Sequence, residues 1–432
     1  MKQKAKRKPQ KADAQAKKPR HLYRIVLVLL AVILAAVNLL ALSQKFCDRF
    51  TDRMYPKIAE GLGRLTAPLP FALGEILLYL GIALLAAGGI IAVLLIFLHK
   101  KEPYRRFAKG YCKALLMTLC CVGLALTFCR WIPARGSVLG QGDAESRDRF
   151  AYQELQILLS YLADGANAAA GQIPVAEDGT ITYPTPEQYR ADIEASLHTL
   201  AHDFPRLGGF CPPVKDALCP QLLQKLDRGA MPLPCTMEII HDNSGELTPM
   251  TQPFADAAAL CQHLGYYDRE QAEFLAMLAL AKSDNQFLRL IGFRKMYREI
   301  EFHYDSARRA YVKAVCEEQG IERPTHEYAE IKDLPLEEFN AVLEKEAAFD
   351  SEIAGPKPEL IHRCDQLVTA ADLNSHKIYI SPDDPEYQTP EIDNSISKAA
   401  DFNWLTEDTN LLETTYTNAE LYILQYFDGK LY

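Results

Sequence analysis

Two histidines stand four residues apart in the segment from His198 to His202. On an α-helix this spacing puts both imidazoles on one face, which is how a histidine pair reaches one metal ion. A zinc site needs three or more converging ligands, and the sequence shows only these two, beside Asp203. We therefore expect solvated or hydrogen-bonded histidines at this position rather than a metal site.

A second segment, from His326 to Glu330, begins like a zincin motif because His326 is followed by Glu327. A zincin needs a second His four positions after the first, and Glu330 stands there instead. The flanking residues are charged: Glu322, Arg323, Lys332 and Asp333. Since apolar residues flank a buried zincin helix, we expect a solvated helix start capped by Thr325, without catalysis.

Signatures of several other enzyme classes are missing. The chain has no Gly-x-Ser-x-Gly elbow, no Gly-x-x-x-x-Gly-Lys phosphate loop and no dinucleotide-binding glycine pattern. Its 11 cysteines include no Cys-x-x-Cys pair, so a zinc site of that type is not expected. Disulfide pairing cannot be deduced from the spacing of these cysteines.

Three long apolar runs occupy the first third of the chain: Ile25 to Leu42, Ile76 to Leu98 and Ala114 to Cys129. About 20 apolar residues span a hydrocarbon core, so residues 25–130 are predicted to be a membrane anchor with three transmembrane helices. Glu75, which precedes the second run, is expected at the outer interface or paired with a base such as Arg64. Cleavage of the first run near Ser43, as in a secretory signal, is an alternative.

Charge is divided unevenly along the chain. Residues 1–130 hold 22 basic and 6 acidic side chains, whereas residues 131–432 hold 25 basic and 50 acidic ones. Because basic segments stay cytoplasmic, we predict a cytoplasmic tail over 1–24 and an extracytoplasmic domain over 131–432. An acidic domain repels phosphate backbones, so no nucleic acid is expected as a partner beside the lipid bilayer.

Residues 131–432 are expected to form one mainly α domain with a minor β element. Thr185 caps a helix that begins at Pro186 and runs to about Phe204. The proline-rich segment Gly208 to Leu247 has two short apolar runs, where a small sheet fits. Further helices are expected over Arg149 to Ala170, Phe254 to Ala281, Asp284 to Gln319, Leu336 to Ala354, Glu359 to Leu367 and Ala419 to Phe427, and a turn-rich tail over Asn374 to Leu405.

The stretch from Ala257 to Phe274 lies inside the helical pattern expected over Phe254 to Ala281. A zincin helix carries His at i and i+4 to bind the metal and a Glu after the first His to deprotonate bound water. This stretch has no such triplet. It follows a proline-rich segment, Gly229 to Glu238, and a segment that precedes the second apolar run, Pro70 to Ile76.

Together with the three apolar runs, these segments resemble an uncharacterised family of bacterial membrane proteins, domain of unknown function 3810. The resemblance covers most of the chain. It implies three N-terminal spans and an outer, zincin-like domain. In the family, His-Glu-x-x-His is followed by a Gly and by a Glu-x-Glu-Ala-Asn-Phe element.

Gly265, Ala272 and Phe274 set the register of this resemblance. The family's first His, its Glu, its second His and its two later acids fall, in this order, on Ala258, Ala259, Gln262, Arg269 and Gln271. A later Tyr-Ser-Gly-Tyr is altered to the segment Leu290 to Phe293. Because Ala and Gln do not hold zinc here and an Arg repels it, the resemblance implies a degenerate member without catalytic, cofactor-binding or metal-binding residues at these positions.

Three hypotheses about function follow. The first is a membrane-anchored pseudo-metallopeptidase that binds a peptide or an envelope partner in its former cleft. The second is an active peptidase with relocated ligands, in which His198, His202 or His326 is recruited, and elemental analysis for zinc discriminates between the two. The third is a purely structural envelope protein, and an ordinary pair of buried helices in an unrelated helical domain is the alternative to the zincin-like interpretation.

Overall fold

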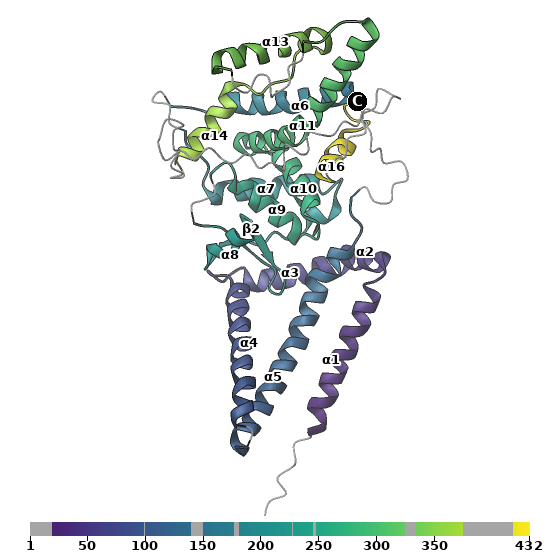
Figure 1. Ribbon diagram of the computed structural model, residues 1–432. Helices are drawn as coiled ribbons and strands as arrows, with labels where there is room; N and C mark the ends of the chain where they lie inside the picture. Colours follow the sequence, from purple (N-terminus) through teal and green to yellow (C-terminus); the bar gives the residue numbers. More distant parts are fainter. Residues whose placement is uncertain are drawn as a thin grey trace, which may run out of the picture.

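The structure is a computed structural model that describes residues 20–98, 100–139, 150–176, 181–226, 228–244, 248–324, 334–374 and 418–432. These residues are mostly helical with little strand, and three helices near the N-terminus are candidate membrane spans, which confirms the expected fold class. The spans extend away from a helical domain that lies at one of their ends (Figure 1).

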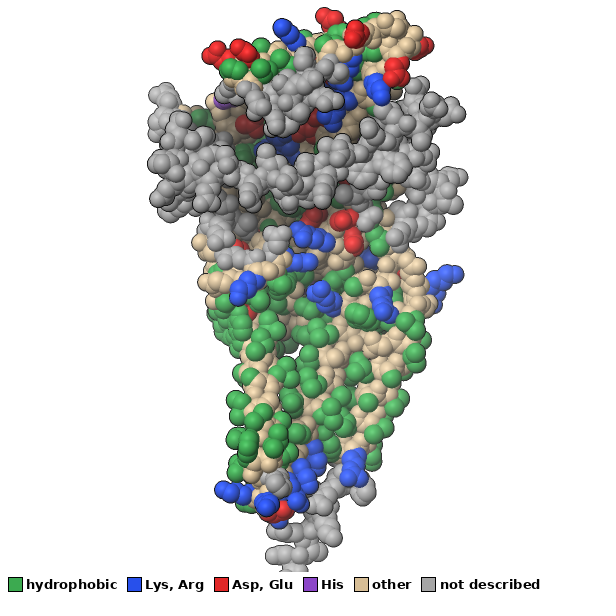
Figure 2. All heavy atoms as spheres, viewed as in Figure 1, with side chains coloured by type: hydrophobic (Ala, Val, Ile, Leu, Met, Phe, Trp, Pro, Cys, Tyr) green, Lys and Arg blue, Asp and Glu red, His purple; other side chains and the backbone are tan. Residues whose placement is uncertain are grey.

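The three candidate spans are α1 (Arg20–Leu40), α4 (Leu73–Leu98) and α5 (Glu102–Leu126). A π-helical turn, η1 (Thr127–Trp131), continues α5, and a 3-10 turn, η2 (Pro133–Arg135), follows. Each span is long and apolar enough to cross a membrane, and its apolar side chains are exposed on the surface of the chain. They form a broad apolar band with Lys and Arg near both of its ends (Figure 2).

Two short helices that the sequence analysis does not include connect α1 to α4. They are α2 (Gln44–Arg53) and α3 (Tyr55–Thr66), and they lie across the ends of the spans next to the domain (Figure 1). We call them the collar. Buried residues recur along α3 at intervals of four, at Tyr55, Ala59 and Gly63. Tyr55 and Ala59, together with residues of α2 and η1 and with Met237, form a second hydrophobic core between the spans and the domain.

The main core lies within the helical domain. Ten of the 13 residues of α10 (Arg269–Ala281) are buried, so this helix is the centre of the domain. The surrounding helices are α6 (Tyr152–Gln172), α7 (Pro186–Leu200), α9 (Gln252–His263), α11 (Gln286–Gln319) and α16 (Asn418–Phe427). The outer helices are α13 (Leu336–Ala354), which lies farthest from the spans, and α14 (His362–Asn374) (Figure 1).

A small sheet lies in the proline-rich segment where it is expected. Its strands are β1 (Val214–Asp216), β2 (Ala230–Leu233) and β3 (Glu238–His241), in the order β1-β3-β2, with the short helix α8 (Pro220–Lys225) between β1 and β2. Val214 pairs with Ile239 in the parallel ladder and Ala230 with His241 in the antiparallel one. Sheet residues pack on α9 in the main core, and Met237, between β2 and β3, packs on the collar. The sheet segment therefore connects the collar to the helical core.

Several helix boundaries differ from those expected. The pattern from Phe254 to Ala281 is two helices, because Gly265 has a φ of 102° and ends α9 before α10 begins. The helix that begins at Pro186 ends at Leu200 and is followed by the 3-10 turn η3 (Pro205–Gly208). The turn-rich tail expected over Asn374 to Leu405 lies, after its first residue, outside the described residues. The segment 325–333, which contains His326, lies outside them too.

Glu75 is not paired with Arg64. Its buried carboxylate accepts hydrogen bonds from the backbone N–H groups of Leu218 and Cys219, at 2.7 and 2.9 Å. Arg64 forms an exposed ion pair with Glu60 at 2.9 Å instead. Backbone donors from the domain therefore satisfy this carboxylate, which the sequence could not indicate because they come from a distant segment.

A buried ion pair forms the second contact of α4 with the domain. Glu238 Oε1 lies 2.6 Å from Lys215 Nζ, and both side chains are almost fully buried. The Glu238 carboxylate also accepts the backbone N–H groups of Leu73 and Gly74, at 3.1 and 2.7 Å, at the start of α4. Burial raises the pKa of Glu238, but these donors outweigh it and hold the pKa below its usual value.

Candidate functional site

Three of the positions that the resemblance singles out, Ala258, Ala259 and Gln262, lie on α9, which presents Ala258 and Gln262 one turn apart on the same side. The other two, Arg269 and Gln271, lie in the first turn of α10. Ala258 packs against the main core and Ala259 is buried. The side-chain oxygen of Gln262 accepts a hydrogen bond from Arg228 Nη1 at 3.1 Å. Gln262, the position that the resemblance assigns to the second His, therefore carries an amide that binds a guanidinium.

Two further arginines lie near Arg228. Burial lowers the pKa of Arg228, and the positive charges of Arg269 and Arg130 lower it further, while Glu273 opposes this change. Arg269 forms an ion pair with Glu273 at 2.7 Å. We call Arg130, Arg228 and Arg269 the arginine cluster. Glu273 offsets one of these three positive charges, and the remaining charge favours an anion over a metal cation at this place.

The two histidines of the segment from His198 to His202 do not form a pair. His198 is on α7, and its Nε2 lies 3.2 Å from the carbonyl oxygen of Gly209. His202 follows the end of α7, is exposed, and its Nδ1 lies 3.0 Å from Asp203 Oδ1. The helix ends too early for both imidazoles to share one face.

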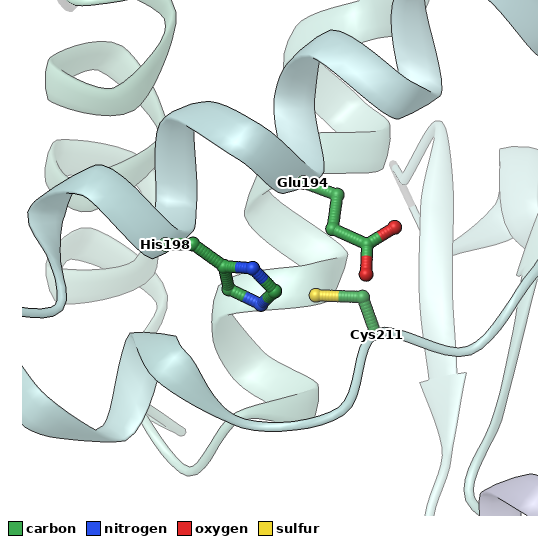
Figure 3. A group of neighbouring side chains, drawn as sticks. All are labelled: Glu194, His198 and Cys211. Atoms are coloured by element: carbon green, nitrogen blue, oxygen red, sulfur yellow. The ribbon is translucent and has the colours of Figure 1, made fainter.

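His198 instead has two partners that the sequence analysis missed. Glu194, one turn earlier on α7, and Cys211, which follows η3, point toward it (Figure 3). One possible ligand atom from each residue lies within 4.8 Å of the other two. Glu194 and His198 are exposed and Cys211 is half-buried. The Glu-x-x-x-His spacing was visible in the sequence, but only the fold brings Cys211 to it.

The thiol of Cys211 is protonated in the absence of a metal. Burial raises its pKa to about 12, and the negative charge of Glu194 raises it too. Besides burial, the charge of a Cys211 thiolate raises the pKa of the buried Cys261. A nucleophilic thiolate is therefore absent here unless a cation binds.

A buried ionic network lies at the start of α9. Asp256, which is fully buried, accepts a hydrogen bond from Tyr189 Oη at 2.9 Å and lies 3.4 Å from Arg190 Nε. His241 Nδ1 lies 3.4 Å from Asp256 Oδ1, and its Nε2 lies 2.8 Å from Asp216 Oδ1. Burial lowers the pKa of His241, but the two carboxylates outweigh burial and the net shift is upward. This network joins α7, α9 and the sheet.

His263 follows Gln262 on the same helix and is a buried, neutral residue. Its side chain is fully buried, and burial lowers its pKa to about 4 although the backbone of Phe210 opposes this shift. The carbonyl oxygen of His263 accepts a hydrogen bond from Tyr55 of the collar at 2.6 Å. This histidine therefore belongs to the contact between the domain and the collar rather than to a metal site.

Comparison with known proteins adds one finding. The model of a protein family described as "Protein of unknown function (DUF3810)" matches residues 50–342. No curated protein and no solved structure matches the chain. The matched segment begins in the collar and ends in α13, so it includes two of the three spans, the sheet and the helices α6 to α11.

Proposed function

We propose that this chain, which belongs to DUF3810, a family of proteins of unknown function, is a membrane-anchored binding protein without zincin catalysis. Its ligand is an anionic group of a peptide or of an envelope partner. The group is held near Gln262 by the arginine cluster, where an active zincin would hold its metal.

The arginine cluster carries this proposal. Arg228 is half-buried and already donates to Gln262, so its guanidinium is held in place rather than free in solvent. A guanidinium presents parallel N–H groups that match a carboxylate, and such charge-assisted pairs are stronger than neutral hydrogen bonds. A carboxylate that enters this region also relieves the repulsion between Arg228 and its two basic neighbours.

The location of the domain is part of the proposal. The tail over 1–24 is cytoplasmic, residues 25–130 form the anchor, and the domain over 131–432 is extracytoplasmic in a bacterial cell membrane. Ten basic residues in the first 24 support this orientation, because basic segments stay on the cytoplasmic side. The partner is then a molecule of the cell envelope.

A peptide-binding experiment tests the proposal. The full-length chain in nanodiscs of zwitterionic lipid is titrated with a fluorescent peptide that has a free C-terminal carboxylate, and with the same peptide amidated at its C-terminus. We expect the carboxylate form to bind at least about tenfold more tightly, and Arg228→Gln to remove that difference. Arg309→Gln, a change at an exposed arginine on α11, is the matched control.

Two outcomes would contradict the proposal. Equal binding of both peptides by the wild type and by Arg228→Gln would show that the cluster does not recognise a carboxylate. Zinc-dependent cleavage of either peptide would favour the active metallopeptidase with relocated ligands. Since the purely structural alternative predicts no binding at all, the same titration tests it too.

A further inference from the structure

We propose that Glu194, His198 and Cys211 bind one zinc ion. This site is separate from Gln262 on α9, whose side chain binds Arg228. It differs from our expectation from the sequence, in which His198 has no metal. If the site exists, zinc content alone does not separate the binding protein from an active peptidase, and the peptide-cleavage measurement separates them.

The three side chains supply a ligand set that suits zinc. Thiolate sulfur, imidazole nitrogen and carboxylate oxygen are its usual protein ligands, at distances of about 2.0 to 2.3 Å. In a tetrahedral site such ligand atoms lie about 3.5 Å apart, and here they lie within 4.8 Å of one another. Rotation of the exposed Glu194 and His198 side chains closes this difference, because neither is packed in the core.

The surroundings favour metal binding in two ways. The Nε2 of His198 can donate its proton to the carbonyl oxygen of Gly209, at 3.2 Å, which leaves Nδ1 with the lone pair that a metal needs. Glu194 and His198 are i and i+4 on one helix, so they are already aligned. When zinc binds, the Cys211 thiol releases its proton to solvent and the Zn–S bond forms.

The position of Cys211 indicates what the ion would do. The preceding residue, Phe210, is within 3.0 Å of the place where a Cβ on Gly63 would lie, and its ring is 5.0 Å from the guanidinium of Arg64. Gly63 and Arg64 belong to α3, in the collar. A zinc ion bound by α7 and Cys211 would therefore fix the segment through which the domain contacts the collar.

Metal analysis tests the site directly. The full-length chain is purified in detergent, kept reduced, stripped with a chelator, incubated with zinc sulfate and desalted. We expect about one zinc per chain in the wild type, and at least a tenfold loss of affinity in Cys211→Ser and in His198→Ala. His202→Ala, in the adjacent histidine, and Cys219→Ser, in another half-buried cysteine, are matched controls that retain zinc.

Two additional measurements distinguish the loss of a zinc ligand from misfolding of a variant. Cobalt in place of zinc should give a thiolate-to-metal charge-transfer band in the wild type that Cys211→Ser lacks. Zinc should raise the melting temperature of the wild type and leave that of Cys211→Ser unchanged. No zinc in the reduced wild type, or zinc that Cys211→Ser and His198→Ala retain, overturns the inference. Arg228→Gln should still bind zinc, so this test and that of the anion site are independent.

Discussion

At Gln262, an amide side chain binds the guanidinium of Arg228 at 3.1 Å. In the register that we propose, a His of the family's pattern stands at this position and an acid at that of Arg269, and these ligands would attract a dication. The loss of these ligands stays a prediction from the sequence. The sequence could not predict the positive charge, because Arg228 and Arg130 come from other segments.

His263 gives a prediction about pH. Its pKa falls from about 6.5 in the unfolded chain to about 4 in the folded one, so the unfolded chain binds the extra proton first as the pH falls. The contribution of this residue to stability is present above pH 6.5 and is lost toward pH 4. Between pH 7.5 and pH 5 we expect a loss of about 2 kcal/mol from this residue alone.

The measurement compares the wild type with His263→Leu, which fills the buried site and does not titrate. Thermal unfolding in detergent is followed at pH 7.5 and pH 5. The variant should lose less stability than the wild type over this interval. An identical loss in both proteins would show that His263 is protonated in the folded chain or is not buried.

The contact of α10 with α11 depends on the absence of a side chain at Gly292. A Cβ there would lie 2.3 Å from the backbone nitrogen of Ala281 and 2.6 Å from the carbonyl oxygen of Met277. These are backbone atoms of α10, so relief requires the two helices to separate. The close approach of α10 and α11 therefore accounts for a glycine at position 292.

We therefore expect Gly292→Ala to destabilise the domain by about 1 to 3 kcal/mol, as overpacking in a well-packed core does. Gly171→Ala is the control, because nothing lies within 4 Å of a Cβ at that position near the end of α6. It should be neutral or slightly stabilising. Thermal unfolding measures the stability of both variants. Equal stability of Gly292→Ala and Gly171→Ala would contradict the close approach of α10 and α11.

The buried pair at the start of α4 gives a prediction for the joint between anchor and domain. Glu238→Gln leaves the Lys215 ammonium buried without its carboxylate, and breaking such a pair costs about 3 to 5 kcal/mol. Glu60→Gln removes an exposed partner of Arg64 and should cost at most about 0.5 kcal/mol. We expect limited proteolysis to cut the Glu238→Gln protein faster than either the wild type or Glu60→Gln. Equal rates would mean that this pair does not hold α4 to the domain.

The sequence predicted features with a local signal and missed those that depend on distant contacts. The three spans and α13 (Leu336–Ala354) follow from apolar runs and helical periodicity alone. The collar was missed because only a few of its residues, such as Tyr55 and Ala59, are both buried and apolar. These residues pack against Met237, which comes from a distant segment of the domain. The grouping of Glu194, His198 and Cys211 was missed for the same reason, since Cys211 comes from a different segment.

The orientation of the whole molecule is the last prediction. Lys100 and Lys101 lie between the second and third spans, and the basic residues of 1–24 precede the first, so both segments should be cytoplasmic. Three crossings then leave the domain on the outer side. The proposed envelope partner requires this orientation, whereas the zinc and anion sites do not.

Fusions to the chain measure the orientation. Alkaline phosphatase, which needs an oxidising compartment, should be active when fused after Tyr432 and inactive when fused after Lys101. Green fluorescent protein at the same two positions should give the opposite pattern. Fluorescence of the fusion after Tyr432, together with an inactive phosphatase there, would place the domain in the cytoplasm. The anionic ligand would then have to be a cytoplasmic peptide or protein, and the basic residues before and between the spans would not set the topology of this chain.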